Sequence, residues 1–263
     1  MTTTMHQSFL TGEVAESPHL TESWSKAMIY LIGGPPRCGK TTVAHRLAQR
    51  TGASCLSLDY IQSVVYHYLS DTERILTHPL FPEATIEARY AAHTADEIIA
   101  NYQMRARSIW PAIQVLIHFA LAEDLNFILE GYHLEPRFCQ EFISPDSSFA
   151  QPSSAWSVYQ AMMVQRGTGY ALRHADDPRI KAVFLYREDV DTITASLTQA
   201  TASDDWLGRQ TNTKLTLRRI ARMVSHYSHY IRTEAKQYGC MAINMDLDFE
   251  QQMEQIITGM TDG

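Results

Sequence analysis

Cysteine is scarce in this sequence, and the few cysteines lie far apart. The four of them are Cys38, Cys55, Cys139 and Cys240. No two have the short spacing that a zinc site or a redox dithiol requires. The cysteine content therefore points to a reducing compartment.

Long hydrophobic runs are also absent. The best candidate, residues 113–122, is too short to span a bilayer and contains His118. The N-terminus has no basic segment leading into an apolar run, which is the pattern of a secretory signal. We therefore expect a cytoplasmic protein with no membrane partner.

Positive charge is in short supply. Lysine and arginine total 22 against 29 aspartates and glutamates, which gives a net charge of -7. The averaged field repels polyanions, so we expect no nucleic-acid partner, although a local basic patch could still bind a phosphate. The length of 263 residues suits one large α/β domain with insertions. The oligomeric state stays open at this point.

Short β-type runs alternate with helical patterns along most of the chain. The runs expected as strands are residues 27–32, 54–58, 126–129, 181–186 and 241–245. The helices expected to follow strands are residues 41–50, 60–69, 190–199 and 250–257. This alternation predicts an α/β fold with a central five-stranded parallel sheet flanked by helices.

Three segments interrupt the alternation, and a tail precedes it. Residues 1–24 are expected to form a flexible tail before a single domain over 25–263. A helical insertion is expected over about 70–124, with one helix at 83–103 and another that Pro111 begins or kinks. An irregular insertion is expected over about 139–178, and a basic, arginine-bearing lid over about 203–225.

A phosphate-binding motif lies between the first expected strand and the first expected helix. Gly34 is followed by four residues and then by Gly39, Lys40 and Thr41, which is the Walker A spacing. Glycine lets the backbone close around phosphate oxygens. Lys40 supplies a charge near the β and γ phosphates, and the Thr41 hydroxyl can ligate Mg²⁺. The motif predicts a P-loop NTPase fold that binds ATP and Mg²⁺, with the preference for ATP over GTP left open.

The residues expected to hold the nucleotide are Gly34, Arg37, Cys38, Gly39, Lys40, Thr41 and Thr42. Pro35 and Pro36 lack amide hydrogens, but the donors of this motif come mainly from the later positions of the loop. Cys38 has two interpretations. It either makes the site sensitive to oxidation or is a tolerated small residue.

Two carboxylates follow the second and third expected strands. Asp59 and Glu130 should face the phosphates, because ligands bind beyond the carboxyl ends of parallel strands. In one division of roles, Asp59 takes the proton from an attacking hydroxyl and Glu130 holds the metal. The opposite division stays open. So do plainer roles, a helix cap for Asp59 and a surface position for Glu130.

Basic residues of the expected lid are candidates for catalysis. They are Arg209, Lys214, Arg218, Arg219 and Arg222. Arginine on a lid can neutralise charge that develops on a moving phosphoryl group. Arg218 and Arg222 are the catalytic candidates, with a solvated basic helix as the alternative.

Candidates for acceptor binding are weaker. Arg105 and Arg107 could contact an anionic substrate, and His133 could line the pocket or be structural. His226 and His229 have the spacing of a helical metal pair. Because no third ligand accompanies them, we interpret them as surface or packing residues.

The chain resembles the small-molecule P-loop kinases, and most closely 2-phosphoglycerate kinase. The resemblance rests on residues 32–42 and on the segment 127–136, whose Glu130-Gly131-Tyr132-His133-Leu134 is similar to that family's Glu-Gly-Val-His-Leu. Residues 106–124 and 230–239 also resemble their counterparts. Tyr132 replaces the usual small apolar residue, and the segment 139–177 has no recognisable counterpart. Zeta toxins and chloramphenicol phosphotransferase share the layout, and in them an acidic residue at the place of Asp59 acts as base.

The resemblance implies an ATP- and Mg²⁺-dependent kinase that phosphorylates a hydroxyl of a small, anionic molecule. Lys40 would hold the nucleotide, Thr41 and Glu130 the metal, and Asp59 would activate the acceptor. Arg105, Glu130 and His133 would complete the acceptor site. The rival hypothesis is a nucleotide-binding regulator or weak ATPase that acts through a protein partner.

Overall fold

The fold is built on one parallel sheet. The computed structural model of the protein describes residues 27–78, 81, 83–143, 177–201, 210, 211 and 213–262. Within these residues five strands pair in the order β2-β3-β1-β4-β5, and every pairing is parallel. The strands are β1 (Ile29–Gly33), β2 (Ser54–Ser57), β3 (Phe127–Glu130), β4 (Ile180–Tyr186) and β5 (Met241–Asn244).

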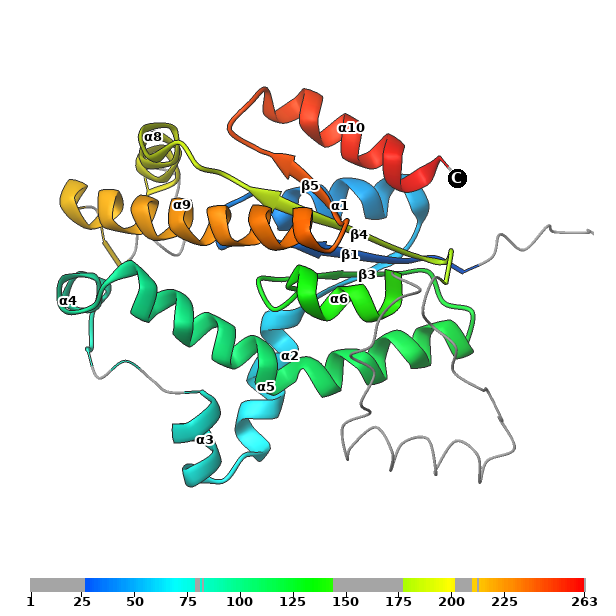
Figure 1. Cartoon of the computed structure of the whole chain (residues 1–263), viewed down its shortest axis with the longest axis horizontal. Helices are drawn as coiled ribbons and strands as arrows, with labels where there is room; N and C mark the ends of the chain where they lie inside the picture. Colours follow the sequence, from blue (N-terminus) through cyan, green and yellow to red (C-terminus); the bar gives the residue numbers. More distant parts are fainter. Residues whose placement is uncertain are drawn as a thin grey trace, which may run out of the picture.

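Helices cover both faces of the sheet (Figure 1). On one face lie α1 (Lys40–Thr51) and α10 (Phe249–Thr261); on the other lie α5 (Ala95–Ala122), α6 (Pro136–Ile143) and α9 (Lys214–Gln237). Because both faces are covered, the central strand β1 is wholly buried. This layering and the phosphate loop after β1 make the fold that of a P-loop NTPase.

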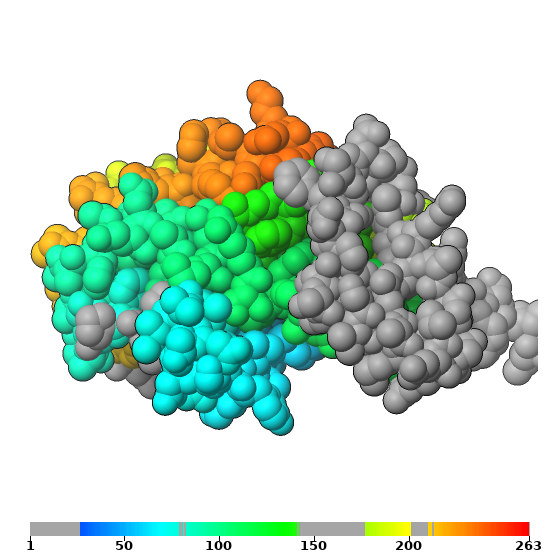
Figure 2. Space-filling view, turned by 60° about the horizontal axis from the view of Figure 1, so that its bottom comes forward, coloured from blue at the N-terminus to red at the C-terminus, as the bar shows by residue number. Residues whose placement is uncertain are grey.

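A helical insertion extends from the sheet between β2 and β3. It comprises α2 (Leu58–Tyr68), α3 (Asp71–Thr77), α4 (Ile86–Ala92) and the long α5. Figure 2 shows α9, the first half of α5 and the α2–α3 pair as successive bands across one side of the molecule. The remaining helix, α8 (Val190–Thr201), packs beside α9.

The predicted strands and the helices at 41–50, 60–69, 190–199 and 250–257 are all confirmed within a few residues. The predictions for the insertion were less accurate. The expected helix 83–103 is interrupted at His93 and Thr94, where α4 ends and a capping box formed by Thr94 and Glu97 starts α5. Helix α5 then runs through Pro111 rather than beginning there.

The continuation through Pro111 has a physical cause. Proline in a helix interior removes one backbone hydrogen bond and crowds the preceding turn. The neighbouring side chains Ile109, Trp110 and Ile113 are buried, and that burial offsets the loss.

The other irregular segments differ in part from expectation. The first residues of the expected irregular insertion, Cys139 to Ile143, belong to α6, whereas residues 144–176 lie outside the described part of the chain, as does the expected tail 1–24. Residues 214–225 of the expected lid are the first three turns of α9, and Leu217, Ile220 and Val224 bury the inner face of those turns. The rest of that lid, including Arg209, lies almost wholly outside the described residues. Within the described chain, no helix combines the length and the apolar character needed to cross a bilayer.

Candidate active site

The phosphate loop joins β1 to α1. Gly34 and Gly39 have φ angles of 129° and 86°, and Arg37 between them has 69°. L-residues with a side chain rarely adopt such angles. A Cβ on Gly34 would stand 2.1 Å from the carbonyl oxygen of Leu185. Only glycine therefore fits at position 34, where the loop passes directly over β4.

The start of α1 is left open for an anion. Its N-cap is Gly39, no side chain caps it, and its first turn contains no acidic residue. The first amide groups of a helix need an outside acceptor, and the positive end of the helix dipole favours an anion. Thr41 and Thr42 are exposed on this turn. The expected nucleotide-binding residues thus fit a polyphosphate.

Lys40 is buried in the loop that it follows. Its side chain is 8% exposed, and Nζ donates a hydrogen bond of 2.7 Å to the carbonyl oxygen of Pro35. Burial lowers the pKa of the ammonium group, while Glu130 and Asp59 act in the opposite direction. Such a partly desolvated cation gains much from a nearby polyphosphate.

Cys38 serves packing rather than redox chemistry. Its thiol is buried 3.9 Å from the hydroxyl oxygen of Ser228 on α9. Burial raises the pKa of the thiol to about 11, so it stays protonated at neutral pH and is a poor nucleophile. Of the two interpretations of Cys38, the structure favours the tolerated small residue.

Asp59 and Glu130 lie at the same edge of the sheet. Glu130 pairs with Ile32 on one side and with Ser57, two residues before Asp59, on the other. Glu130 is 4% exposed, whereas Asp59 is open to solvent. Partial burial raises the pKa of the Asp59 carboxyl; Lys40 lowers it and Glu130 raises it further. The three charged groups form one electrostatic cluster beside the phosphate loop.

His133 lies beneath this cluster and is fully buried. Both its Nε2 atom and the Tyr132 hydroxyl hydrogen-bond to Oε1 of Gln62. The distance from His133 Nε2 to that oxygen is 2.6 Å. Burial lowers the pKa of the imidazole, and Lys40 and Arg105 lower it further, so the ring is neutral. With no exposed surface, His133 positions Gln62 and Tyr132 instead of meeting an acceptor, which favours the structural alternative over the substrate role.

Tyr132 and Arg105 extend the site toward the insertion. The Tyr132 ring meets Tyr102 of α5 edge-on at 4.7 Å, and Tyr102 in turn stacks on Tyr227 of α9 at 6.2 Å. Arg105 hydrogen-bonds the Tyr132 hydroxyl. Burial lowers the pKa of His78, and Arg105 lowers it further. Arg105 therefore lies near Tyr132, and its contact with an acceptor stays a prediction, whereas Arg107 is exposed on the same helix.

The structure also has a pocket beside the phosphate loop, toward the ends of β4 and β5, that the sequence did not predict. It has a volume of about 400 Å³ and combines loop residues with residues that follow β4 and β5. Its lining includes Arg37, Thr42, Arg187, Thr192, Asp246 and Phe249. Asp246 accepts 3.0 Å and 2.8 Å hydrogen bonds from Arg187 Nε and the Asp189 amide. The rule that ligands gather at the carboxyl ends of strands could have pointed to Arg187 and Asp246.

Two arginines of the expected lid lie on the outer face of α9. Arg218 forms a 3.1 Å ion pair with Asp191 of α8, and both side chains are mainly exposed. Arg222 is exposed. Among the described residues, neither has a hydrogen bond or ion pair with the phosphate loop. Their catalytic role stays a prediction.

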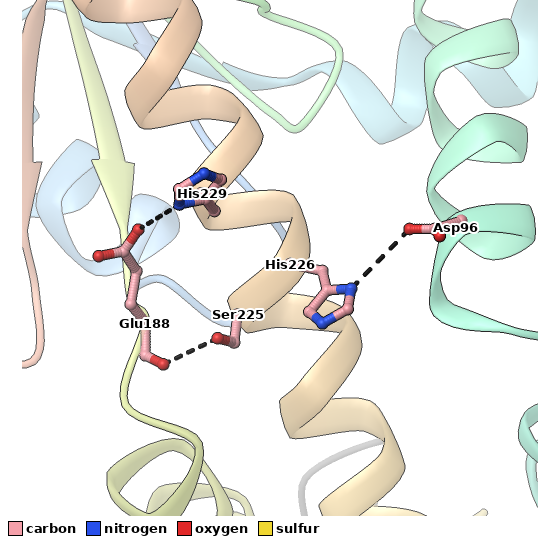
Figure 3. Close-up of a pocket in the computed structure, with 5 residues that line it drawn as sticks. All are labelled: Asp96, Glu188, Ser225, His226 and His229. Carbon is pink, nitrogen blue, oxygen red and sulfur yellow. Dashed lines mark hydrogen bonds and ion pairs between the residues drawn. The ribbon is translucent and has the colours of Figure 1, made fainter.

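His226 and His229 line a pocket of about 490 Å³ near the middle of α9 (Figure 3). His226 faces Asp96 of α5 at 3.8 Å, while His229 faces Glu188 at 3.5 Å. The two rings therefore point to different carboxylates, and both are well exposed. In the part of the chain that the structure describes, no group of three or more His, Cys, Asp or Glu side chains could hold a metal ion.

A magnesium site needs no such group. Mg²⁺ usually binds through one or two protein oxygens, with water and substrate phosphates as its other ligands. In such a site Thr41, exposed on the first turn of α1, and Glu130, which interacts with Lys40 on the same turn, would supply the protein oxygens.

Comparison with known proteins supports the expected resemblance. Over 118 residues the chain is 32% identical to 2-phosphoglycerate kinase of Pyrococcus furiosus, which covers 42% of this chain and 37% of that protein. Over 145 residues it is 26% identical to 2-phosphoglycerate kinase of Methanothermobacter thermautotrophicus, which covers 48% and 45%. The chain is similar to 2-phosphoglycerate kinase. It matches less than half of the length of these relatives.

Other likenesses are more general. The family model for isopentenyl transferase matches residues 27–73, which run from the approach to β1 into α3 and contain the phosphate loop. A shikimate kinase structure from Bacteroides thetaiotaomicron aligns with 89% of this chain and 97% of its own, at 15% identity and a TM-score of 0.41. A thymidylate kinase structure from Candida albicans aligns with 88% and 89%, at 15% identity and a TM-score of 0.40.

Proposed function

We propose that the protein is an ATP- and Mg²⁺-dependent phosphotransferase that moves the γ-phosphoryl group to a hydroxyl of a small anionic molecule. The observation that carries this proposal is the cluster of Lys40, Asp59 and Glu130 between an uncapped helix start and a cation-bearing insertion. A regulator needs the phosphate loop but has no need for a solvent-open carboxylate beside it. The similarity to 2-phosphoglycerate kinase suggests a phosphorylated acid as acceptor.

Each residue of the cluster has a role in the proposal. Lys40 and the amides at the start of α1 hold the β and γ phosphates. Thr41 and Glu130 hold Mg²⁺, which when bound would neutralise charge on those phosphates. The pocket lined by Arg187, Thr192 and Phe249 would take the nucleoside.

Asp59 acts as the base in this proposal. It is open to solvent whereas Glu130 is buried, which favours this division of roles over the reverse. The acceptor oxygen forms a bond to the γ-phosphorus as the bond to the ADP oxygen breaks, and the hydroxyl proton moves to Asp59. The pKa of Asp59 is raised, so the carboxyl becomes protonated, and inactive as a base, at a higher pH than an ordinary aspartate. As pH decreases, kcat/KM should therefore begin to fall at a pH above the usual pKa range of aspartate.

The experiment is a screen for stimulated ADP release. Phosphorylated acids, including 2-phosphoglycerate, are tested beside sugars, nucleosides and antibiotics against the protein-only rate. With the best acceptor, Asp59→Asn should lower kcat by about 10²–10⁴-fold and leave the Kd for Mg·ATP unchanged. Asp71→Asn, an exposed carboxylate on α3, is the matched control and should behave like the parent.

The rival hypothesis, a regulator or weak ATPase, predicts other results. In that case no compound stimulates ADP release, Asp59→Asn has no effect, and a protein partner binds in a nucleotide-dependent way. Those results together would replace the kinase proposal.

A further inference from the structure

Two arginines of the helical insertion stack on aromatic rings but differ in what else they contact. The guanidinium carbon of Arg74 on α3 lies 4.9 Å from the ring centroid of Tyr66, and that of Arg89 on α4 lies 5.0 Å from the centroid of Phe81. Stacking holds a planar guanidinium in one orientation and leaves its edge free to donate hydrogen bonds. Both guanidinium groups therefore lie over an aromatic ring at nearly the same distance.

Arg74 uses its donors within the protein. Its Nε donates to the carbonyl oxygen of Tyr66 at 3.0 Å, Nη2 to that of His67 at 3.4 Å, and Nη1 to the Asp71 carboxylate at 3.1 Å. Its charge is thus paired, and its role is to join α2 to α3.

Arg89 has no such partners among the described residues. Its side chain is half-buried, and its buried Nε atom has no hydrogen-bond acceptor. The carboxylate of Glu83 pairs with His93 at 3.1 Å, and no carboxylate in the described part of the chain forms an ion pair with Arg89. An oriented, partly desolvated guanidinium without an anion is uncommon, because desolvation is expensive when it is not compensated.

The charge of Arg89 reaches the candidate active site. Burial raises the pKa values of the Tyr90 and Tyr102 hydroxyls, which are hydrogen-bonded to each other, and Arg89 acts on both in the opposite direction. Arg105 and Asp59 act on the same Tyr102 hydroxyl, and the Tyr102 ring contacts Tyr132 at 4.7 Å. Arg89 on α4 and Arg105 on α5 are thus two cations that act on the same hydroxyl as Asp59, the carboxylate at the start of α2 that interacts with Lys40.

We propose that Arg89 binds an oxyanion of the acceptor, a phosphate or carboxylate group remote from the reacting hydroxyl, together with Arg105. This proposal rests on the proposed function and deepens it. The paired donors of a stacked guanidinium match the geometry of a phosphate or carboxylate group. An acceptor held at that end would present its hydroxyl to Asp59.

The test measures binding of inorganic phosphate by calorimetry, with the protein first saturated with Mg²⁺ and a non-hydrolysable ATP analogue so that the phosphate loop is filled. Arg89→Gln should weaken phosphate binding by about tenfold or more, because hydrogen bonds to charged groups are among the strong ones. Arg89→Lys should show an intermediate loss, since it keeps the charge without the planar donors. Arg74→Gln is the matched control and should bind phosphate within about twofold of the parent.

Three results would overturn the role of Arg89: an unchanged affinity in Arg89→Gln, an equal loss in Arg74→Gln, or a parent that binds no phosphate. Thermal unfolding of each variant separates lost binding from lost folding, and Arg89→Met, which keeps an apolar stem over Phe81, replaces Arg89→Gln if that variant is unstable. Failure to load the ATP analogue would instead contradict the proposed function. The Arg89 and Arg74 variants can still be compared without the analogue.

Discussion

The candidate active site has a nucleotide half and an acceptor half, and the two differ in whether backbone or side chains form them. The nucleotide half is made largely of backbone, namely the loop after β1 and the uncapped first turn of α1. The acceptor half is made of side chains from segments that are distant in sequence, namely Gln62 of α2, Tyr102 of α5 and Tyr132 in the turn after β3. Backbone geometry is set by a short local motif, whereas a side-chain pocket depends on how several helices pack. The first half should therefore tolerate little change in conformation, and the second should determine the substrate.

The largest expected effect comes from a substitution that alters only backbone freedom in the nucleotide half. Gly34→Ala places a Cβ 2.1 Å from the carbonyl oxygen of Leu185 at a φ of 129°. Backbone cannot move aside as a side chain can, so the free energy of unfolding should fall by roughly 4 kcal/mol or more. Urea unfolding measures the loss.

The control for this prediction is Gly52→Ala at the end of α1. Gly52 has a φ of 70°, but nothing lies within 4 Å of the added Cβ. It should lose only about 1–2 kcal/mol. Equal losses in the two variants would show that the close approach to β4 is unimportant.

A second substitution tests whether side chains also matter in the nucleotide half. Asp246→Ala removes the partner of Arg187 in an ion pair whose side chains are 11% and 10% exposed. Removing one member of a buried pair leaves the other uncompensated, so a loss of about 3–5 kcal/mol is expected. The KM for ATP should rise, since both residues line the pocket proposed for the nucleoside. An unchanged KM in kinetic assays would move the nucleoside elsewhere.

The third prediction concerns a buried carboxylate under the acceptor half. Glu135 is fully buried, contacts Arg137 and lies 3.3 Å from the Tyr227 hydroxyl. Burial raises its pKa to about 7, although Arg137 acts in the opposite direction. Because the pKa of Glu135 is higher in the folded than in the unfolded chain, protonation of Glu135 stabilises the folded state. This contribution to the free energy of unfolding is complete below the usual glutamate pKa and is lost as pH rises through about 7.

Urea midpoints across this pH range test that sign. The parent should lose stability between about pH 5 and pH 8, and Glu135→Gln, which cannot ionise, should lose less over the same range. A steeper loss in Glu135→Gln than in the parent would reverse the assignment.

The smallest effect is expected at the expected lid. Arg218 pairs with Asp191 on an exposed surface, and such pairs contribute at most about 1 kcal/mol. Arg218→Gln should therefore change stability little. A kcat reduced by more than about tenfold, measured with the best acceptor, would instead show that Arg218 reaches the transferring phosphoryl group.

The sequence was sufficient for the phosphate loop of the nucleotide half, though not for the pocket that Arg187 and Asp246 line, and the reason is physical. Gly34, Gly39 and Lys40 lie within a single local motif whose spacing encodes its geometry, and alternation of strands and helices led to the sheet. The placement of Asp59 and Glu130 at strand ends followed from the same topology.

The acceptor half was less predictable. The insertion helices meet through tertiary packing, which leaves no short motif in the sequence. Neither the break between α4 and α5 nor the position of Arg89 could therefore be predicted. His133 looked like a pocket residue because its neighbours in sequence are functional candidates, but its side chain is buried. Basic residues suggested a lid over about 203–225, although the apolar positions Leu217, Ile220 and Val224 mark its residues 214–225 as part of a packed helix.

The central claim is that the loop from Gly34 to Thr41 encloses the phosphates of ATP with the help of one buried ammonium group. Calorimetric titration of Mg·ATP into Lys40→Ala tests it directly, with Lys236→Ala, an exposed lysine on α9, as the control. We predict that Lys40→Ala weakens binding by about 100-fold and that Lys236→Ala leaves it unchanged. Equal affinity of Lys40→Ala and the parent for Mg·ATP would contradict the claim.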